Sequence, residues 1–450
     1  MQGVQIFGTT GSGKSSGSGA FLAKSYLTAG FGGLILTVKI DEKEHWQKYC
    51  QETGRELEIF NLENPWRFNF LDYEMNRVRG GGQTENLVDL FFSILELESN
   101  ERDNKGERYW DNSLKQLLRN TIDLIRLSGQ KMSMSSLYQV ITSAPQNLSD
   151  TKENSSWEQT SFCAKLLLQT MENFENLKEM DKADFDLTQT YWLTEYPNLA
   201  EKTRSIIVSS FTGMADIFLR GSLREMFCTT TTFYPEFTHE GMLLLVDLPV
   251  KVHHKLGQYA QAVLKYCWQK ATENREPERD LRPTFLWADE AQFFINSHDV
   301  SFQSTARSSR ACTVYLTQTL PSYTDNIGLM TKSLLANLQT KIFHRNDEND
   351  TNKYVMEMIG KDWQKRKTSN YNSGQNNLNR LYESENQTDK SSYGVSTTEV
   401  LEYEFLPIEF SKLAKGSWEY ENVVEGLVYQ GGRIWQANGK SFLKVTFWQE

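Results

Sequence analysis

Residues 4–15 read Val4-Gln5-Ile6-Phe7-Gly8-Thr9-Thr10-Gly11-Ser12-Gly13-Lys14-Ser15, and this stretch decides the fold. A largely apolar run with strand character enters a loop of the form G-x-x-x-x-G-K-S. The segment that follows is rich in small residues and can continue as a helix through Phe21, Leu22 and Ala23. A strand before and a helix after are the context that a phosphate-binding loop requires. The alternative is a glycine- and serine-rich turn that matches the motif by chance, and the flanking pattern disfavours it.

The chemistry of phosphate binding explains the residue types in this loop. Glycines let successive backbone N–H groups turn inward toward phosphate oxygens, and the N-terminus of the next helix adds the positive end of its dipole. Lys14 would reach the β- and γ-phosphates, and Ser15 would hold Mg²⁺ through its hydroxyl. We therefore predict ATP and Mg²⁺ as ligands. The predicted nucleotide-binding residues are Gly8, Thr9, Thr10, Gly11, Ser12, Gly13, Lys14, Ser15 and Ser16.

The composition limits the classes of function. The chain has 450 residues and a net charge of −10, whereas a protein that binds nucleic acid over its whole surface is basic. Any contact with DNA must therefore be local. The five cysteines show no CxxC spacing and the six histidines are dispersed, which argues against a zinc site and for reduced thiols. With no run of 18 apolar residues and no signal peptide, we expect a cytoplasmic protein that reaches the inner face of a membrane only through partners.

Strand and helix patterns alternate at both ends of the chain, and a long helical block separates them. Near-continuous apolar runs such as 34–38 are typical of buried parallel strands. We therefore predict an α/β fold with a mostly parallel central sheet and an inserted all-α domain. Its predicted segments are residues 1–82 for the first part of the ATPase domain, 83–221 for the all-α domain and 222–450 for the second part.

Asp289 and Glu290 close the apolar run Thr284-Phe285-Leu286-Trp287-Ala288, which is the Walker B pattern. In that pattern a buried strand delivers an aspartate to Mg²⁺ and a glutamate to the attacking water. Alone the signal is weak, because ordinary strands also end in surface acids. With a phosphate-binding loop in the same chain, it predicts Ser15 and Asp289 as metal ligands and Glu290 as the catalytic base.

Gln318 ends the next apolar run, 312–317, and is a candidate catalytic residue. In a parallel sheet it would lie beside the Walker B end, where a polar side chain can orient water and report the loss of the γ-phosphate. The alternative is an ordinary polar residue at a strand end.

Arg307 and Arg310 precede the same strand and are three residues apart, so they would share one helix face. An arginine that reaches the γ-phosphate of a neighbouring subunit can raise turnover by about 10³- to 10⁵-fold. We predict that role for at least one of the two, with Arg307 first, and the alternative is a solvated helix face. Arg345 is a further candidate.

The final third of the chain adds a polar loop and a β-hairpin. Residues 361–397 are rich in Lys, Asn, Ser and Gln, and we expect a long mobile loop there. Basic and aromatic residues in or near it could bind single-stranded DNA, although a solvated loop is the favoured reading. These residues are Lys361, Lys365, Arg366, Lys367, Tyr371 and Tyr382; Lys251, His253 and His254 are similar candidates for a channel lining. Gly426–Trp435 is hairpin-like with Gly431-Gly432 at its turn, and 441–448 alternates as a strand.

Several of these stretches, taken in order, resemble one family. Over roughly residues 1–415 the chain resembles the conjugative coupling-protein ATPases of type IV secretion, the TraD/TraG group of the HerA/FtsK superfamily. The stretches that carry the resemblance are the P-loop opening, Lys39-Ile40-Asp41-Glu42-Lys43 after a strand, the all-α insertion, Trp287-Ala288-Asp289-Glu290-Ala291-Gln292, residues 307–318, Leu335-Ala336-Asn337-Leu338 and Lys341-Ile342-Phe343-His344-Arg345.

The resemblance implies a RecA-like motor that assembles as a hexamer, with nucleotide sites between subunits, DNA in a central channel and an all-α domain that recognises substrate or relaxosome proteins. The family's Walker A, Walker B, finger and sensor residues carry over onto Lys14 and Ser15, Asp289 and Glu290, Arg307 or Arg310, and Gln318. One departure is that family members usually carry a membrane anchor before the P-loop, where this chain has a single strand. A soluble relative and a trimmed chain are both compatible with that difference.

The sequence therefore predicts an ATP-hydrolysing DNA translocase that works as a homo-hexamer, with single-stranded DNA favoured and secretion or relaxosome proteins as partners. One alternative is a P-loop ATPase that remodels or exports protein, and stimulation of hydrolysis by DNA would distinguish the two. The other is an ATP-binding component of a defence or partition complex. Glu290 argues against that last reading, because a protein that only binds ATP does not need a positioned base.

Overall fold

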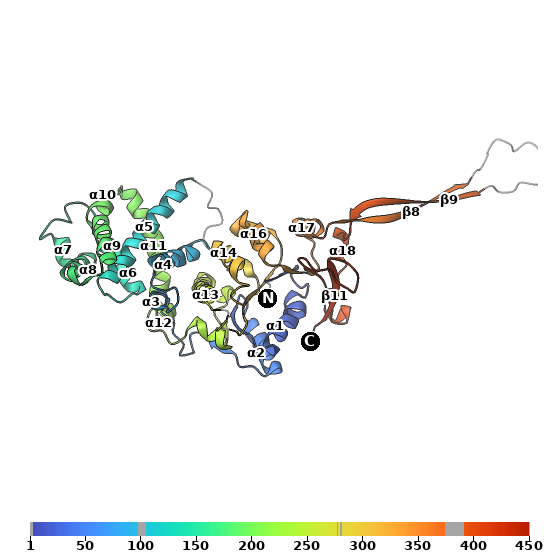
Figure 1. Ribbon diagram of the computed structural model, residues 1–450, viewed down its shortest axis with the longest axis horizontal. Coiled ribbons are helices and arrows are strands. Elements are labelled where there is room, and N and C mark those ends of the chain that lie inside the picture. The colour runs from blue at the N-terminus through green and yellow to red at the C-terminus, as the bar shows by residue number, and fades with distance from the viewer. Residues whose placement is uncertain (1–2, 98–104, 277, 280, 374–390, 450) are drawn as a thin grey trace, which may run out of the picture.

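A nine-stranded sheet forms the centre of the molecule (Figure 1). The computed structural model describes residues 3–97, 105–276, 278–279, 281–373 and 391–449. The strand order is β11-β10-β7-β1-β6-β5-β2-β4-β3, in which β1 to β7 run parallel. β10 is antiparallel to both of its neighbours, β7 and β11, so the edge strand β11 runs in the direction of β1 to β7. The predicted α/β class with a mostly parallel sheet is thus confirmed. The strands are β1 (Val4–Phe7), β2 (Gly32–Leu36), β3 (Glu58–Phe60), β4 (Leu243–Val246), β5 (Thr284–Ala288), β6 (Ala311–Thr317), β7 (Thr340–Phe343), β10 (Val423–Gln430) and β11 (Phe442–Trp448).

Helices cover both faces of this sheet, and the strand residues alternate between the two sides. Ile6 of β1 and Ile35 of β2 pack with α1 (Ala20–Thr28) and α2 (Glu42–Thr53) in one apolar cluster. Phe7 and Leu34 belong to a larger cluster on the other face. That cluster also contains the buried side chains of α13 (Val250–Glu273), α14 (Ser297–Thr305) and α16 (Met330–Asn337). Because successive residues of a strand point to opposite faces, each apolar strand supplies both layers.

A helical block is inserted between β3 and β4 and extends from one side of the sheet (Figure 1). Its apolar core is continuous with the larger cluster on the sheet, so the block packs on the ATPase domain rather than hanging from a linker. No single helix among the described residues is long and apolar enough to cross a membrane; α11 and α12 pass that test only as a pair bent by 86°. The helices are α3 (Phe70–Asn76), α4 (Thr84–Leu95), α5 (Lys105–Leu127), α6 (Met134–Thr142), α7 (Ser156–Thr160), α8 (Phe162–Glu172), α9 (Glu179–Thr190), α10 (Tyr196–Asn198), α11 (Glu201–Leu219) and α12 (Gly221–Phe227).

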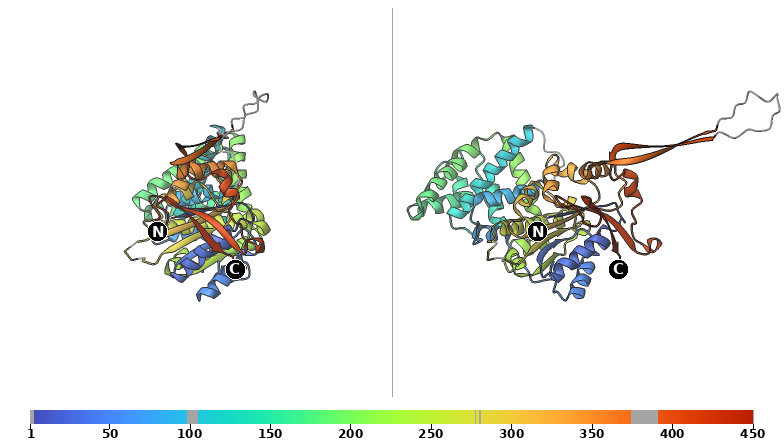
Figure 2. Two further views of the ribbon diagram at one scale, coloured as in Figure 1. Left: turned by 90° about the vertical axis from the view of Figure 1, so that its right-hand side faces the viewer. Right: turned by 45° about the vertical axis from the view of Figure 1, so that its right-hand side comes forward.

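The polar segment after α17 (Asn349–Ile359) is an antiparallel ribbon in its described parts, so the expectation of an irregular loop is wrong there. Strands β8 (Lys361–Ser373) and β9 (Ser391–Tyr403) pair along their whole length and point away from the helical block (Figure 2). The ribbon meets the rest of the molecule near α17, and its side chains over 361–370 and 393–399 are exposed. Both strands contain Thr and Tyr, together with Trp363 in β8 and Val395 and Val400 in β9, and such residues favour a strand over a loop.

The end of the chain returns to the main sheet. β10 pairs with β7 on one side and with β11 on the other, so the predicted C-terminal hairpin is present. Its connection is residues 431–441 rather than a tight Gly-Gly turn, because the strand partner of β10 is β11 and not residues 433–435. The remaining helices are α15 (Pro321–Ile327) and α18 (Pro407–Ser411).

Candidate active site

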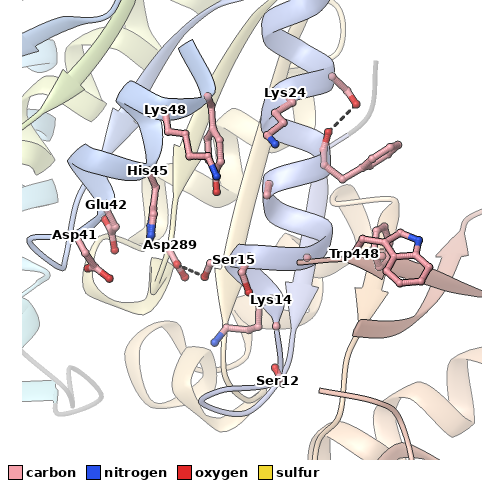
Figure 3. A pocket seen from close by; sticks show the side chains of 18 of the residues that line it. Ser12, Lys14, Ser15, Lys24, Asp41, Glu42, His45, Lys48, Asp289 and Trp448 are labelled. Atoms are coloured by element: carbon pink, nitrogen blue, oxygen red, sulfur yellow. Dashed lines mark hydrogen bonds between the residues drawn. The ribbon is translucent and has the colours of Figure 1, made fainter. Parts of the chain in front are cut away.

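The phosphate-binding loop connects β1 to α1 through a π-helical turn, Lys14–Gly19 (Figure 3). Gly11 and Gly13 have φ angles of 73° and 82°, which side-chain-bearing residues rarely adopt. A Cβ at Gly8 would lie 2.4 Å from Ser12 Oγ, so the loop closes tightly on itself. Thr9 donates its backbone N–H and its hydroxyl to the carbonyl oxygen of Arg345, at 3.1 and 3.2 Å. These contacts hold the loop above the ends of β1 and β7.

Two groups inside the loop lack the partners that their burial calls for. Lys14 is only 5% exposed, and no carboxylate of the described residues forms an ion pair with it. Ser12 Oγ is buried without a hydrogen-bond partner among the same residues. Buried polar groups are normally satisfied, so an unpaired ammonium and an unpaired hydroxyl in one loop fit an anion that both would contact. A polyphosphate is such an anion, and the loop is shaped for it.

Ser15 and Asp289 lie together as the sequence predicted for a metal site. Ser15 Oγ donates to Asp289 Oδ2 at 2.5 Å, joining the start of α1 to the end of β5 (Figure 3). A hydroxyl and a carboxylate at one point are oxygen ligands that suit Mg²⁺, which takes its other ligands from water and phosphate. Among the described residues no group of three His, Cys, Asp or Glu side chains could hold a metal ion. The two residues therefore fit a metal that arrives with a nucleotide.

Glu290 is held in an unusual position next to Asp289. Its φ and ψ of 51° and 50° place a non-glycine residue in the left-handed region, which costs on the order of 1 kcal/mol or more and is common at functional sites. Its carboxylate accepts from Gln292 Nε2 at 2.9 Å and forms an ion pair with Lys39 Nζ at 3.3 Å. Burial raises the pKa of Glu290, but the bond from Gln292 and the charges of Lys14 and Lys39 outweigh it and leave the pKa below its usual range. The side chain is therefore ionised at neutral pH.

Gln318 lies where the sequence predicts, at the end of β6 between the P-loop strand and the Walker B strand. Its amide Nε2 lies 3.3 Å from each carboxylate oxygen of Glu290. Its backbone carbonyl oxygen accepts from Asn346 Nδ2 at 2.9 Å. Thr317 donates to Gln292 Oε1 at 2.8 Å, so β6 braces both amides that contact Glu290. Gln318 thus contacts Glu290 through its side chain and the segment after β7 through its backbone.

The two candidate finger arginines lie at the amino ends of the parallel strands, which we call the amino edge of the sheet. The P-loop and Walker B residues lie at the opposite, carboxyl ends, the carboxyl edge. Arg307 and Arg310 are exposed and occupy the turn between α14 and β6, so the expectation that they share a helix face is wrong. Arg310 has a φ of 55° and donates to the carbonyl of Leu281 at 2.9 Å, which ends the helical path before β6 begins. Since β6 rises about 3.3 Å per residue, these arginines are roughly 20 Å from Gln318 of the same chain, beyond the reach of a side chain.

Sequence reasoning missed two contributors to the site. Lys39 was noted only as part of a charged loop, yet it forms the ion pair with Glu290; its position after the β2 strand was the available signal. The charges of Asp289 and Glu290 raise the pKa of Lys39 against the lowering effect of its burial. Burial, followed by the charge of Asp289, likewise raises the pKa of Glu42 well above its usual range.

The second missed contributor is the C-terminal hairpin. Residues 445–448 of β11 form one wall of a cleft of about 980 Å³ whose floor is the P-loop. His344 links the two parts, with Nε2 2.6 Å from Ser18 Oγ and Nδ1 2.9 Å from the carbonyl of Glu425. Burial lowers the pKa of His344 to about 4, so it is neutral. The local sequence does not predict this wall, because the wall depends on the pairing of β10 with β7.

The residues considered for DNA contact are dispersed. Lys251 Nζ lies over the ring of Phe293 at 5.3 Å, and His254 lies at a kink in α13 with a φ of 49°. Lys365 and Arg366 are on the ribbon, where they face Glu399 and Glu402 as ion-pair partners. Lys361 and Lys367 are also on β8, as is the backbone of Tyr371, and Tyr382 lies outside the described residues. The basic residues of this set therefore lie on two separate elements, the ribbon and α13.

Comparison with known proteins agrees with this geometry. A family model described as the TraM recognition site of TraD and TraG matches residues 283–406. Solved structures of the conjugative coupling protein TrwB match the whole chain. The chain has the fold of a conjugative coupling protein. The resemblance drawn from the sequence is therefore confirmed, and a search of curated proteins finds no match.

Three TrwB structures give the extent of the likeness. The trigonal form in complex with sulphate has a TM-score of 0.62 at 14% sequence identity. The complex with ADP and Mg²⁺ has a TM-score of 0.60 at 16% identity, and the unbound monoclinic form has 0.59 at 15%. Each match covers 100% of this chain and 85% of the TrwB chain. At this level of identity the likeness establishes the RecA-like fold with its helical insertion.

Proposed function

We propose that this chain is an ATP-hydrolysing motor of the coupling-protein type, which moves DNA through the channel of a homo-hexameric ring. The observation that carries the proposal is the Ser15–Asp289 contact, with the unpaired Lys14 on one side and the ionised Glu290 on the other. A protein that only binds nucleotide has no need of Glu290 in a strained, ionised position. The full-length likeness to TrwB, seen in complexes with ADP and Mg²⁺ and with an ATP analogue, supports ATP as the nucleotide.

Each side chain has a definite task in this proposal. Lys14 and the loop N–H groups hold the β- and γ-phosphates, while Ser15 and Asp289 hold Mg²⁺, which neutralises charge on the phosphates. Glu290 accepts a proton from the attacking water, and its lowered pKa means that it is already deprotonated at neutral pH. Gln318 and Gln292 keep the carboxylate oriented through their amide N–H groups.

The arginine that stabilises the transition state would come from another copy of the chain. Arg307 and Arg310 lie at the amino edge of the sheet, too far from the chain's own site. A head-to-tail ring repeats one interface, so the amino edge of each copy can face the carboxyl edge of the next. We assign the finger role to Arg307 first and Arg310 second, because the side chain of Arg310 is engaged with Leu281.

The partners follow from the same comparison. The family model that matches residues 283–406 is described as a TraM recognition site, so we propose that this part of the chain contacts a relaxosome or secretion protein. DNA, with single strands favoured, is the proposed cargo. The proposed location is the cytoplasm, at the inner face of the membrane through those partners.

The test is ATP hydrolysis by purified protein over a range of protein concentrations, with no DNA, single-stranded DNA or duplex DNA. We expect steep dependence on protein concentration, because the site is shared between copies, and stimulation by DNA. Lys14→Ala should abolish the activity, and Lys202→Ala, an exposed lysine on α11, should leave it unchanged. A rate of ATP hydrolysis that does not change when DNA is added would overturn the translocase proposal in favour of a protein-remodelling ATPase.

A further inference from the structure

We propose that the nucleobase of the bound nucleotide stacks on an aromatic rim formed by Phe21 of α1 and Trp448 of β11. The proposal rests on the proposed nucleotide site and names the part of the chain that holds the other end of the same ligand. Both rings line the cleft above the P-loop, and both are unusually exposed for their size, at 61% and 67%. Figure 3 shows Trp448 on the strand beside α1, on the far side of that helix from Asp289.

The strand order fixes the direction in which the nucleotide must lie. Its γ-phosphate has to face Asp289 and Glu290, which follow β5. The order of strands from there is β5-β6-β1-β7-β10-β11, with the P-loop after β1. A nucleotide whose phosphates cross the P-loop from the β5 side therefore carries its base toward β10 and β11. The base therefore does not lie on the opposite side of the cleft, where α2 follows β2 beside the Walker B strand.

The C-terminal hairpin is built against the P-loop rather than merely near it. A Cβ at Gly13 would lie 2.5 Å from a methyl carbon of Val424, and one at Gly17 would lie 3.0 Å from the same side chain. Gln449 donates from Nε2 to Ser16 Oγ at 2.6 Å. Ser16 directly follows the Mg²⁺-binding serine, and Gln449 directly follows Trp448. The contact therefore ties the indole-bearing end of β11 to the residue next to the phosphate site.

The neighbouring residue of β11 shows how this end of the strand is held. Phe447 is buried, and its ring lies 6.0 Å from that of Phe21 and 5.9 Å from that of His344. Phe447 thus anchors the strand to α1, while the indole of Trp448 is left at the rim of the cleft. An aromatic ring at the edge of a cleft gives a flat base a stacking surface. Stacking reads the face of a base and not its edge, so the rim would accept adenine and guanine alike.

The experiment compares two ligands by calorimetry in the presence of Mg²⁺: a non-hydrolysable ATP analogue and inorganic triphosphate. Stacking on an aromatic side chain contributes enough that Trp448→Ala should weaken the analogue by about 5- to 150-fold. Phe21→Ala should also weaken binding of the analogue. Neither variant should change the affinity for inorganic triphosphate, which has no base. Trp448→Phe, which keeps an aromatic ring, should retain most of the affinity for the analogue.

The matched control is Trp363→Ala, because Trp363 is 65% exposed but lies on the β8–β9 ribbon. It should leave both affinities unchanged. Equal affinities of wild type and Trp448→Ala for the analogue would overturn the rim. If Trp448→Ala weakened binding of the analogue and of triphosphate equally, the proposed rim would also be overturned, because the indole would then affect the phosphate site rather than the base. If wild-type protein binds neither ligand, the nucleotide site itself fails and the rim with it, whereas binding of triphosphate alone refutes only the rim.

Discussion

The carboxyl edge and the amino edge of the central sheet differ in the catalytic groups that they carry. At the carboxyl edge, Lys14, Ser15, Asp289 and Glu290 converge from separate elements, and most of them are buried or bonded to one another. At the amino edge, Arg307 is exposed and forms no ion pair with any described residue. One chain therefore supplies the phosphate, metal and base functions of an ATPase, whereas its Arg307 and Arg310 lie out of reach of them; Arg345, whose backbone carbonyl accepts from Thr9, is the candidate arginine beside the P-loop. The proposed interface between two copies would bring the groups of the two edges together.

Removing the amino-edge arginine should have the largest effect. Arg307→Ala should lower turnover by about 10³- to 10⁵-fold, because the transition-state charge would lose its partner from the neighbouring copy. Nucleotide binding to the isolated chain should be unchanged, since the carboxyl edge is intact. Steady-state hydrolysis and calorimetry measure the two quantities, with Arg220→Ala on the helical block as the control. Unchanged turnover in Arg307→Ala would return the role to Arg310 or Arg345.

Removing the base at the carboxyl edge should have the next largest effect. Glu290→Gln should slow hydrolysis by about 10²- to 10⁴-fold, because the amide cannot accept a proton from water. Binding of ATP should persist, so the variant should hold ATP in single-turnover experiments where wild type releases ADP. Glu44→Gln, an exposed carboxylate on α2, is the control. A variant that still turns over at the wild-type rate would remove Glu290 from the chemistry.

The ion pair between Lys39 and Glu290 should have a smaller effect. Lys39 is partly exposed, so its Coulomb attraction to Glu290 is screened, and Lys39→Ala should lower turnover by about 2- to 5-fold. The charge of Lys39 helps to lower the pKa of Glu290, so its loss should raise that pKa. Glu290 would then become protonated at a higher pH as the solution is acidified. The acid limb of the pH–rate profile should therefore move to higher pH, and a shift to lower pH would contradict the assigned contact.

The sequence predicts the parts of this comparison that depend on contiguous residues. The P-loop needs only glycines at fixed spacing, and Walker B needs only a buried strand that ends in two acids. The position of Gln318 follows because consecutive parallel strands end at one edge. The remainder depends on pairings between distant segments. The Arg307 turn is set by Arg310 reaching Leu281, and the hairpin wall is set by β10 joining β7.

The β8–β9 ribbon shows a different limit of sequence reasoning. Its side chains over 361–370 and 393–399 are exposed on both sides, so the usual alternation of buried and exposed side chains is weak. Composition then indicates a loop, although the β-branched and aromatic residues allow a paired strand. Cross-strand pairs such as Trp363 with Leu401 are visible only once the register is known.

The measurement that tests the shared site most directly is a mixture of two inactive variants. Lys14→Ala lacks the carboxyl-edge function and Arg307→Ala lacks the amino-edge function. In an equal mixture, up to about a quarter of head-to-tail interfaces would pair an intact Lys14 with an intact Arg307. We predict that hydrolysis returns toward that fraction of wild-type activity under the same conditions. A mixture that stays inactive at every ratio, while wild-type protein hydrolyses ATP, would contradict a site shared between copies.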